Sequence, residues 1–139
     1  MDPFAKIKKM KTLLIDDDEL IRDSLSMAFL NKGCFLMAVG SAEEGLRAMK
    51  RNQFDIIISD FFLPGMNGID FFKQAVFGQT DSMNVLITGN VNSKNLLKKN
   101  KAKVDDIVQK PFSIMTLAQS LAALTETRKP NSQNLNRTF

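Results

Sequence analysis

Histidine is absent from this 139-residue chain. A single chain without it cannot build imidazole acid–base catalysis, a Ser-His-Asp or Cys-His pair, or a histidine metal site. Tryptophan and tyrosine are also absent, and the one cysteine is Cys34. A lone cysteine cannot form an internal disulfide, so we expect Cys34 to be a small core residue at the start of a strand.

Long apolar runs are missing too. No run approaches the roughly 20 residues of a membrane span, and the N-terminus has no apolar segment typical of a secretory signal. We therefore expect a soluble, cytoplasmic chain with no membrane partner. The length suits one domain. The expected organisation is a basic N-terminal extension over residues 1–10, a folded domain over 11–126, and a polar tail or the start of a linker over 127–139.

The net charge of +4 is unevenly placed, with lysine clusters near residues 6–11 and 94–103. Such clusters could attract nucleic acid. However, no aromatic side chains are interleaved with them for base stacking. We interpret the lysines as solvated surface and expect no nucleic-acid binding by this domain alone.

The apolar pattern alternates between short runs and helical periodicity, which predicts an α/β fold built from βαβ units. Strands are expected over residues 12–15, 35–39, 55–59, 83–88 and 104–109. Helices are expected between them, including a lysine-rich one at about 92–100, and a last helix carries Leu117 and Leu121. Gly33 is expected to follow the end of the first helix, and Ser41 with Glu44 forms a capping box for the second.

Polar side chains stand where four of these strands end. Asp16, Asp17 and Asp18 follow the first strand, and the other three strand ends carry Asp60, Thr88 and Lys110. In an open parallel sheet these ends share one crevice. Carboxylates are Mg²⁺ ligands, and an ammonium suits phosphoryl oxygens. Each residue alone has an ordinary explanation, such as Asp18 capping a helix, but their joint occurrence predicts a cation and phosphoryl site.

Four motifs in this order closely resemble the receiver domain of bacterial two-component response regulators. The resemblance covers about residues 11–126. It rests on Leu14-Ile15-Asp16-Asp17-Asp18, on Ser59-Asp60 with Leu63-Pro64-Gly65-Met66-Asn67-Gly68, on Thr88-Gly89, and on Lys110-Pro111-Phe112.

The resemblance implies a flavodoxin-like fold, in which a doubly wound parallel sheet of five strands in the order 2-1-3-4-5 is flanked by five helices. It implies that Asp60 is the phosphoacceptor. Mg²⁺ (or Mn²⁺) would be held by Asp17, Asp60 and the main-chain carbonyl of Phe62, with Asp16 acting through a coordinated water. Thr88 and Lys110 would contact the phosphoryl group, and the Lys110–Pro111 bond would be cis.

The resemblance also implies partners. Because this chain has no histidine, the phosphoryl group would come from a sensor histidine kinase or a histidine phosphotransfer protein. The domain would catalyse its own phosphorylation and dephosphorylation and would not be a turnover enzyme. Phosphorylation would switch the face built from the fourth helix, fifth strand and fifth helix. A homodimer through that face, at Ile107 and Leu117, is left open.

Three positions depart from the usual receiver pattern. Phe62 replaces a polar residue that helps to place the hydrolytic water, so we expect a long-lived phosphoryl state. Ile107 replaces the aromatic ring that typically moves inward with the threonine, so the switch is expected to be coupled differently. Gln109 replaces an apolar residue and is expected to reach solvent at the end of an edge strand.

Two other functions fit parts of the sequence. In a haloacid-dehalogenase-type phosphatase, Asp16 would be the nucleophile and Asp18 the acid/base. The threonine or valine expected two residues further on is Leu20 here, and no cap domain is evident. A receiver-like module that binds partners without being phosphorylated is the second alternative, although such a module has no need to keep every group of a phosphoryl site.

Overall fold

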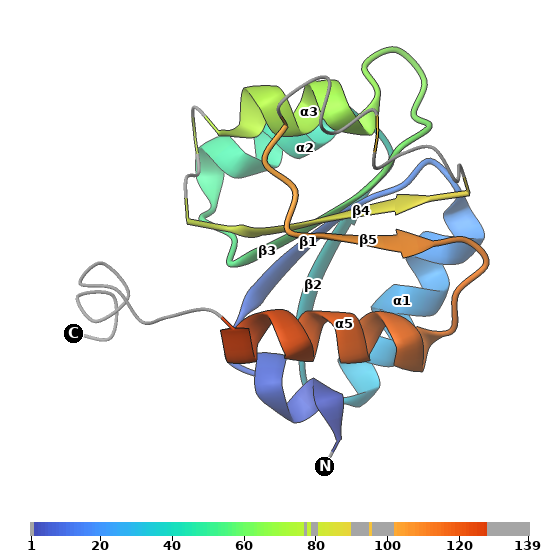
Figure 1. Cartoon of the computed structure of the whole chain (residues 1–139), viewed down its shortest axis with the longest axis vertical. Coiled ribbons are helices and arrows are strands. Elements are labelled where there is room, and N and C mark those ends of the chain that lie inside the picture. The colour runs from blue at the N-terminus through green and yellow to red at the C-terminus, as the bar shows by residue number, and fades with distance from the viewer. Residues whose placement is uncertain (1, 77, 79–80, 90–94, 96–101, 128–139) are drawn as a thin grey trace.

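The predicted α/β fold is confirmed by a computed structural model, which describes residues 2–76, 78, 81–89, 95 and 102–127 (Figure 1). A single parallel sheet of five strands has the order β2-β1-β3-β4-β5. Its strands are β1 (Lys11–Ile15), β2 (Phe35–Val39), β3 (Ile56–Asp60), β4 (Met83–Thr88) and β5 (Asp106–Gln109). Most of the lysine-rich helix expected at 92–100, and all but the first residue of the tail, lie outside the described residues.

Helices cover both faces of the sheet. Helices α1 (Glu19–Asn31) and α5 (Ile114–Thr127) lie on one face, and α2 (Ala42–Arg51) and α3 (Gly68–Ala75) lie on the other (Figure 1). Strands β1, β3 and β4 are central and almost entirely buried, as expected for strands covered on both faces. Alternate side chains of one strand therefore enter different cores: Leu14 packs with α1 and α5, and Leu13 with α2 and α3.

The helix ends follow the capping residues in the sequence. The Asp18 carboxylate accepts a hydrogen bond from the Leu20 N–H at 2.9 Å, and the Ser41 hydroxyl accepts one from the Glu44 N–H at 3.1 Å. Glu44 completes the capping box by accepting from the Gly40 N–H, one residue before the usual donor. Gly33 follows the α1 cap with a positive φ of 71°, as predicted.

The ten residues before β1, which the sequence presented as a basic extension, contain a 3₁₀ helix, η1 (Pro3–Ile7). Its Phe4 and Ile7 are buried in the core between the sheet and α1/α5. The rings of Phe4 and Phe29 meet edge to face at a centroid distance of 5.4 Å. Cys34 is 7% exposed beside them, at the start of β2, as expected. The structured part of the chain therefore begins before Lys11.

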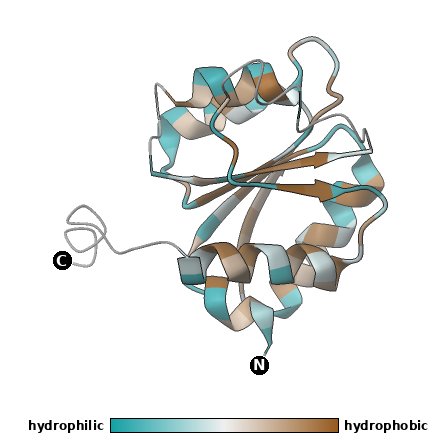
Figure 2. Ribbon diagram, viewed as in Figure 1, coloured by the Kyte–Doolittle hydropathy of each residue, from teal (hydrophilic) through white to brown (hydrophobic). Residues whose placement is uncertain are grey.

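Hydropathy follows these layers, with apolar residues along the strands and polar residues on the outer helix surfaces (Figure 2). Within the described part of the chain, no helix combines the length and apolar character that crossing a membrane requires.

Candidate functional site

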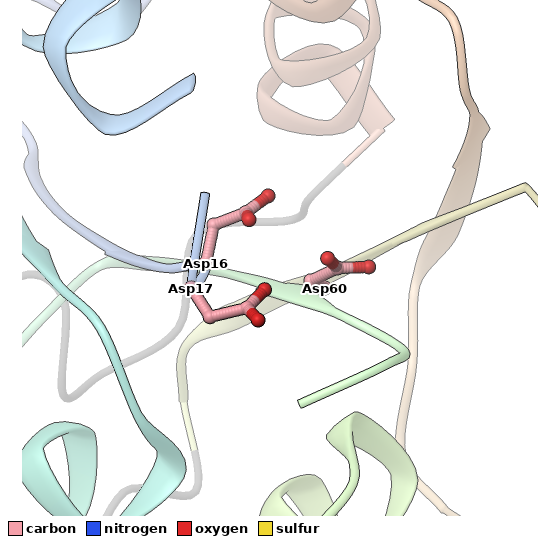
Figure 3. A group of neighbouring side chains, drawn as sticks. All are labelled: Asp16, Asp17 and Asp60. Carbon is pink, nitrogen blue, oxygen red and sulfur yellow. The ribbon is translucent and has the colours of Figure 1, made fainter. Parts of the chain in front are cut away.

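Three carboxylates gather at the edge of the sheet where the strands end (Figure 3). Asp16 and Asp17 follow β1, and Asp60 is the last residue of β3. Because β1 and β3 are parallel with Ile15 opposite Ser59, the residues that follow this pair emerge side by side. One oxygen from each carboxylate lies within 4.8 Å of the others. The predicted acidic cluster is therefore present.

Asp16 is the most buried member of this cluster, with 0% exposure. Its Oδ1 accepts a hydrogen bond from the Asp18 N–H at 2.9 Å. Its Oδ2 is buried and has no hydrogen-bond partner among the described residues. Burial raises the pKa of Asp16 above its usual 3.8, and the Asp60 charge adds to this, whereas the Asp18 N–H and Lys110 oppose it. The pocket therefore holds a carboxylate oxygen that has no hydrogen bond among the described residues and whose charge is offset there by the Lys110 ammonium.

Lys110 places its ammonium between two of the acids. Its Nζ lies 2.9 Å from Asp60 Oδ2, to which it donates a hydrogen bond, and 3.3 Å from Asp16 Oδ2. Burial disfavours the ammonium, but the hydrogen bond to Asp60 and the charges of both acids outweigh it and raise the pKa of Lys110. The lysine is therefore charged at neutral pH and offsets part of the negative charge of the cluster.

Thr88 and Lys110 are joined through the backbone at the same edge. Thr88 is the last residue of β4 and is 1% exposed. The Lys110 N–H donates to the Thr88 carbonyl at 2.8 Å, and the next bond, Lys110–Pro111, is cis as expected. On the other side, Asp60 pairs with Ile87, the residue before Thr88. The polar residues predicted for the crevice therefore lie at one edge of the sheet: Asp16, Asp17, Asp60, Thr88 and Lys110.

The connection after β3 places Phe62 close to Asp60. The Phe62 N–H donates to Asp60 Oδ1 at a long 3.4 Å, while the Phe62 side chain is 62% exposed. Gly68, at the start of α3, lies so close to the end of β3 that a Cβ on it would overlap the main-chain oxygen of Asp60. From the sequence, Gly68 was only part of a turn. Its role is to let α3 approach the end of β3.

Arg22 is a second residue that the sequence did not reveal. Its guanidinium Nη1 donates to the main-chain oxygen of Asp16 at 2.8 Å. The sequence showed only that an arginine lies near the start of the helix after the acidic residues. An arginine at that position is equally typical of a solvated helix surface, so it did not indicate this contact.

The donor set suits a hard divalent cation. Mg²⁺ and Mn²⁺ take oxygen ligands, and Mg²⁺ usually keeps several waters beside one or two carboxylates. Here Asp17 is exposed, Asp16 Oδ2 has no hydrogen bond among the described residues, and Lys110 pairs with both Asp60 and Asp16. The residues present therefore fit the Mg²⁺ site expected from the sequence.

Several other expectations can be compared with the structure. The Asp18 carboxylate caps α1 and is not in the carboxylate cluster, so it is not placed as the second acid of a dehalogenase-type reaction. Gln109 is exposed at the end of the edge strand β5, as predicted. Leu117, named with Ile107 for the dimer face that the sequence left open, is 1% exposed and packs in the core. It is not available on such a face, because the apolar spacing of α5 marks its inward side.

Comparisons with known proteins agree with the fold and the acidic pocket. Residues 12–122 match the response regulator receiver domain family, and the chain belongs to this family. Receiver domains are phosphoacceptor signalling modules of two-component systems, in which they partner with histidine kinases, and they are not turnover enzymes of the usual kind. The cluster of Asp16, Asp17 and Asp60 is typical of a receiver Mg²⁺ site.

Individual relatives share part of their length with this chain. The two-component response regulator PhoP of Pseudomonas aeruginosa is 34% identical over 116 residues, which are 83% of this chain and 51% of that protein. The sensory/regulatory protein RpfC of Xanthomonas campestris is 30% identical over 124 residues, 86% of this chain and 17% of that protein. The chain thus spans about half, or less, of the length of these relatives.

Solved structures share the fold. The receiver domain of the Francisella response regulator 1452 has a TM-score of 0.76 and 25% identity, covering 87% of this chain and 100% of that one. The chemotaxis response regulator CheY4 of Vibrio cholerae has a TM-score of 0.75 and 24% identity, covering 83% and 98%.

Proposed function

We propose that this chain is a phosphorylation-controlled receiver in which Asp60 accepts a phosphoryl group from a phosphohistidine of a partner protein. The donor would be a sensor histidine kinase or a histidine phosphotransfer protein, because the chain has no histidine of its own. The observation that carries the proposal is the position of Asp60. It lies in a carboxylate cluster, at the end of a buried strand, with the Lys110 ammonium 2.9 Å away.

The transfer breaks the phosphorus–nitrogen bond of the donor and forms a phosphorus–oxygen bond to Asp60, while the imidazole keeps the electron pair. Bound Mg²⁺ would supply positive charge against the oxygens of the transferred group, with Asp16, Asp17, Asp60 and the Phe62 carbonyl in the roles expected of them. Lys110 starts paired with Asp60 and can follow the new charge onto the phosphoryl oxygens. The Thr88 hydroxyl would bond another of these oxygens.

The product carries a charge of about −1.5 to −2, by analogy with other phosphorylated residues. That charge gives Thr88 and Lys110 a new anionic partner at the edge between β4 and β5. Since the two residues are joined by a main-chain hydrogen bond, a shift of one is transmitted to the other. This transmitted shift would be the physical origin of a switch at the β5 side of the domain.

A groove beside the site supports a protein donor. It has a volume of about 580 Å³, and Lys110 contributes to both the groove and the acidic cluster. Leu20 at its rim is 76% exposed. The remaining lining is mainly apolar and comes from α1, from the connection after β5 and from the first residue of α5: Ile21, Ser24, Leu25, Pro111, Phe112 and Ile114. An apolar helix of the donor could dock here with its histidine facing Asp60.

The proposal is tested by incubating the protein with Mg²⁺ and acetyl phosphate and measuring its intact mass. We expect one phosphoryl adduct per chain in the wild type. We expect none in Asp60→Asn, because the acceptor oxygen is replaced by an amide nitrogen, and none when EDTA removes the divalent cation.

Asp23→Asn is the matched control, because Asp23 is an exposed acid on α1 outside the carboxylate cluster, and it should be modified like the wild type. If the wild type remains unmodified, the chain is a non-phosphorylated interaction module. Catalytic turnover of a phosphate ester that depends on Asp16 and survives Asp60→Asn would instead identify a dehalogenase-type phosphatase.

A further inference from the structure

The Arg22 side chain reaches back from α1 to the loop that follows β1. It is half-buried, and Nη1 donates to the main-chain oxygen of Asp16 at 2.8 Å. Among the described residues this is the hydrogen bond of the Arg22 side chain, which forms no ion pair within 4.0 Å there. The guanidinium is therefore committed to the backbone of the acidic loop.

This contact fixes more than Asp16 itself. The Asp16 N–H donates to the Val39 carbonyl at 3.1 Å, so the peptides on both sides of Asp16 are held. Because a peptide unit is planar, fixing the Asp16 carbonyl also fixes the N–H of Asp17. The orientation of that plane helps to set the direction in which the Asp17 side chain points toward the cluster. Arg22 thus acts on the two neighbouring carboxylates through one carbonyl.

The space for the guanidinium is provided by a glycine. A Cβ on Gly40 would lie 3.3 Å from Arg22 Nη1, which is closer than most Cβ contacts, and 3.7 Å from its Cζ, an ordinary contact. The Gly40 N–H is held by Glu44 Oε2 at 2.8 Å. The Arg22 guanidinium therefore packs against the connection between β2 and α2, and a side chain at residue 40 would require it to shift by a few tenths of an ångström.

Charge favours the same arrangement. Arginine stays protonated at any ordinary pH, so a permanent positive charge lies beside the main chain of Asp16, a member of the carboxylate cluster. A hydrogen bond from a charged donor is also stronger than one between neutral groups. Lysine could supply the charge, but its single ammonium would not reproduce the planar guanidinium lying against Gly40.

We infer that Arg22, seated against Gly40, is a positioning residue that sets the Asp16–Asp17 peptide so that the acidic cluster can bind a divalent cation. The inference rests on the proposed function, since this is the cation that phosphorylation of Asp60 would need. It adds a residue outside the carboxylate cluster that controls the cation affinity of that cluster.

The test measures the Mn²⁺ dissociation constant from the electron paramagnetic resonance signal of the free ion, a readout that does not depend on phosphorylation. We expect Arg22→Gln to weaken binding about tenfold, the size typical of losing a residue that orients metal ligands. Arg47→Gln is the control, because Arg47 is exposed on α2 and its loss should leave the constant unchanged. Arg22→Lys should be intermediate.

Gly40→Ala provides an independent arm. It should weaken Mn²⁺ binding in the same direction by displacing the guanidinium. In the Arg22→Gln background, however, it should add almost nothing, since the group it displaces is gone. Additive effects of the two substitutions would overturn the pairing of Arg22 with Gly40.

The outcomes also separate this inference from a merely structural role and from the proposed function. If Arg22→Gln lowers the urea midpoint but leaves the Mn²⁺ constant unchanged, Arg22 only stabilises the fold and the inference is overturned. It is equally overturned if the wild type binds no Mn²⁺. If the wild type binds Mn²⁺ in an Arg22-dependent way yet accepts no phosphoryl group, the positioning role stands and the proposed function fails.

Discussion

Asp16 is the most buried carboxylate of the site, and its Oδ2 forms an ion pair with Lys110 at 3.3 Å but no hydrogen bond among the described residues. Burial raises its pKa above the usual 3.8. A raised pKa in the folded state means that the stabilising contribution of Asp16 is complete below pH 3.8 and is lost as the pH rises through the folded-state pKa. At neutral pH, without a cation, the ionised Asp16 therefore opposes folding.

We predict that Asp16→Asn raises the midpoint of urea unfolding at neutral pH in the absence of divalent cations. The gain should vanish below pH 3.8, the usual carboxyl pKa, because the wild-type carboxyl is then neutral as well. Added Mg²⁺ should reduce the gain, since only the wild type recovers binding energy from it. Far-UV circular dichroism measures each midpoint, and Asp23→Asn is the control. A variant less stable than the wild type at neutral pH would contradict this account.

The polar residues of the site could be predicted from the sequence because their positions follow from chain order alone. Asp16, Asp60, Thr88 and Lys110 each stand at the end of a parallel strand, and parallel strands end at one edge. Arg22 and Gly68 could not be predicted in the same way. Arg22 donates a hydrogen bond to the main-chain oxygen of Asp16, and Gly68 lies close to that of Asp60. Such contacts depend on how a helix approaches the end of a strand in space.

The connection from β3 to α3 carries two neighbouring aromatic rings. Phe61 is 9% exposed, while Phe62 is 62% exposed, and their rings meet edge to face at 4.8 Å. The Phe62 ring, anchored to its buried neighbour, stands two residues after Asp60, the proposed acceptor, where it offers no hydrogen bond to an attacking water. This arrangement supports the expectation of slow hydrolysis.

We predict that Phe62→Asn shortens the lifetime of phosphorylated Asp60 by severalfold, because the amide can orient a water toward the phosphorus atom. The measurement follows phosphate release from protein that was first phosphorylated and then freed of excess acetyl phosphate. Phe35→Asn, which changes a 43% exposed phenylalanine at the start of β2, should have no effect. Equal lifetimes for Phe62→Asn and the wild type would show that the ring only packs beside Phe61.

Element boundaries were predicted less well than element order, and β5 shows why. The apolar pattern placed its start at residue 104, whereas β5 begins at Asp106. The Asp105 carboxylate accepts a hydrogen bond from the Asn84 N–H at 2.7 Å. The Asn84 N–H thus bonds to a side chain instead of a main-chain oxygen. The regular pairing of β4 with β5 starts one residue later, at Val85 with Asp106. Periodicity cannot distinguish these two acceptors.

The N-terminal segment belongs to the folded unit, which therefore begins earlier than the sequence suggested. The family match starts at residue 12, and the lysines of residues 6–11 suggested a solvated extension. Phe4 and Ile7 of the N-terminal segment are nevertheless only 3% and 1% exposed, and they pack in the core with residues of α1 and α5. Lys6 also forms an ion pair with Glu126 of α5 at 3.3 Å, although an exposed pair of this kind contributes little. Burial of Phe4 and Ile7 is therefore the main link between η1 and the rest of the fold.

We predict that Phe4→Ala lowers the free energy of unfolding by about 3 to 5 kcal/mol, the usual cost of truncating a buried phenylalanine. Phe35→Ala, at a ring that is 43% exposed, should cost much less. Urea unfolding measures both. Because η1 precedes β1 and lies at the opposite end of the strands from Asp60 (Figure 1), the folded fraction of Phe4→Ala should still accept phosphoryl groups from acetyl phosphate. A cost for Phe4→Ala no larger than that for Phe35→Ala would mean that the folded unit begins at β1, with η1 only resting on its surface.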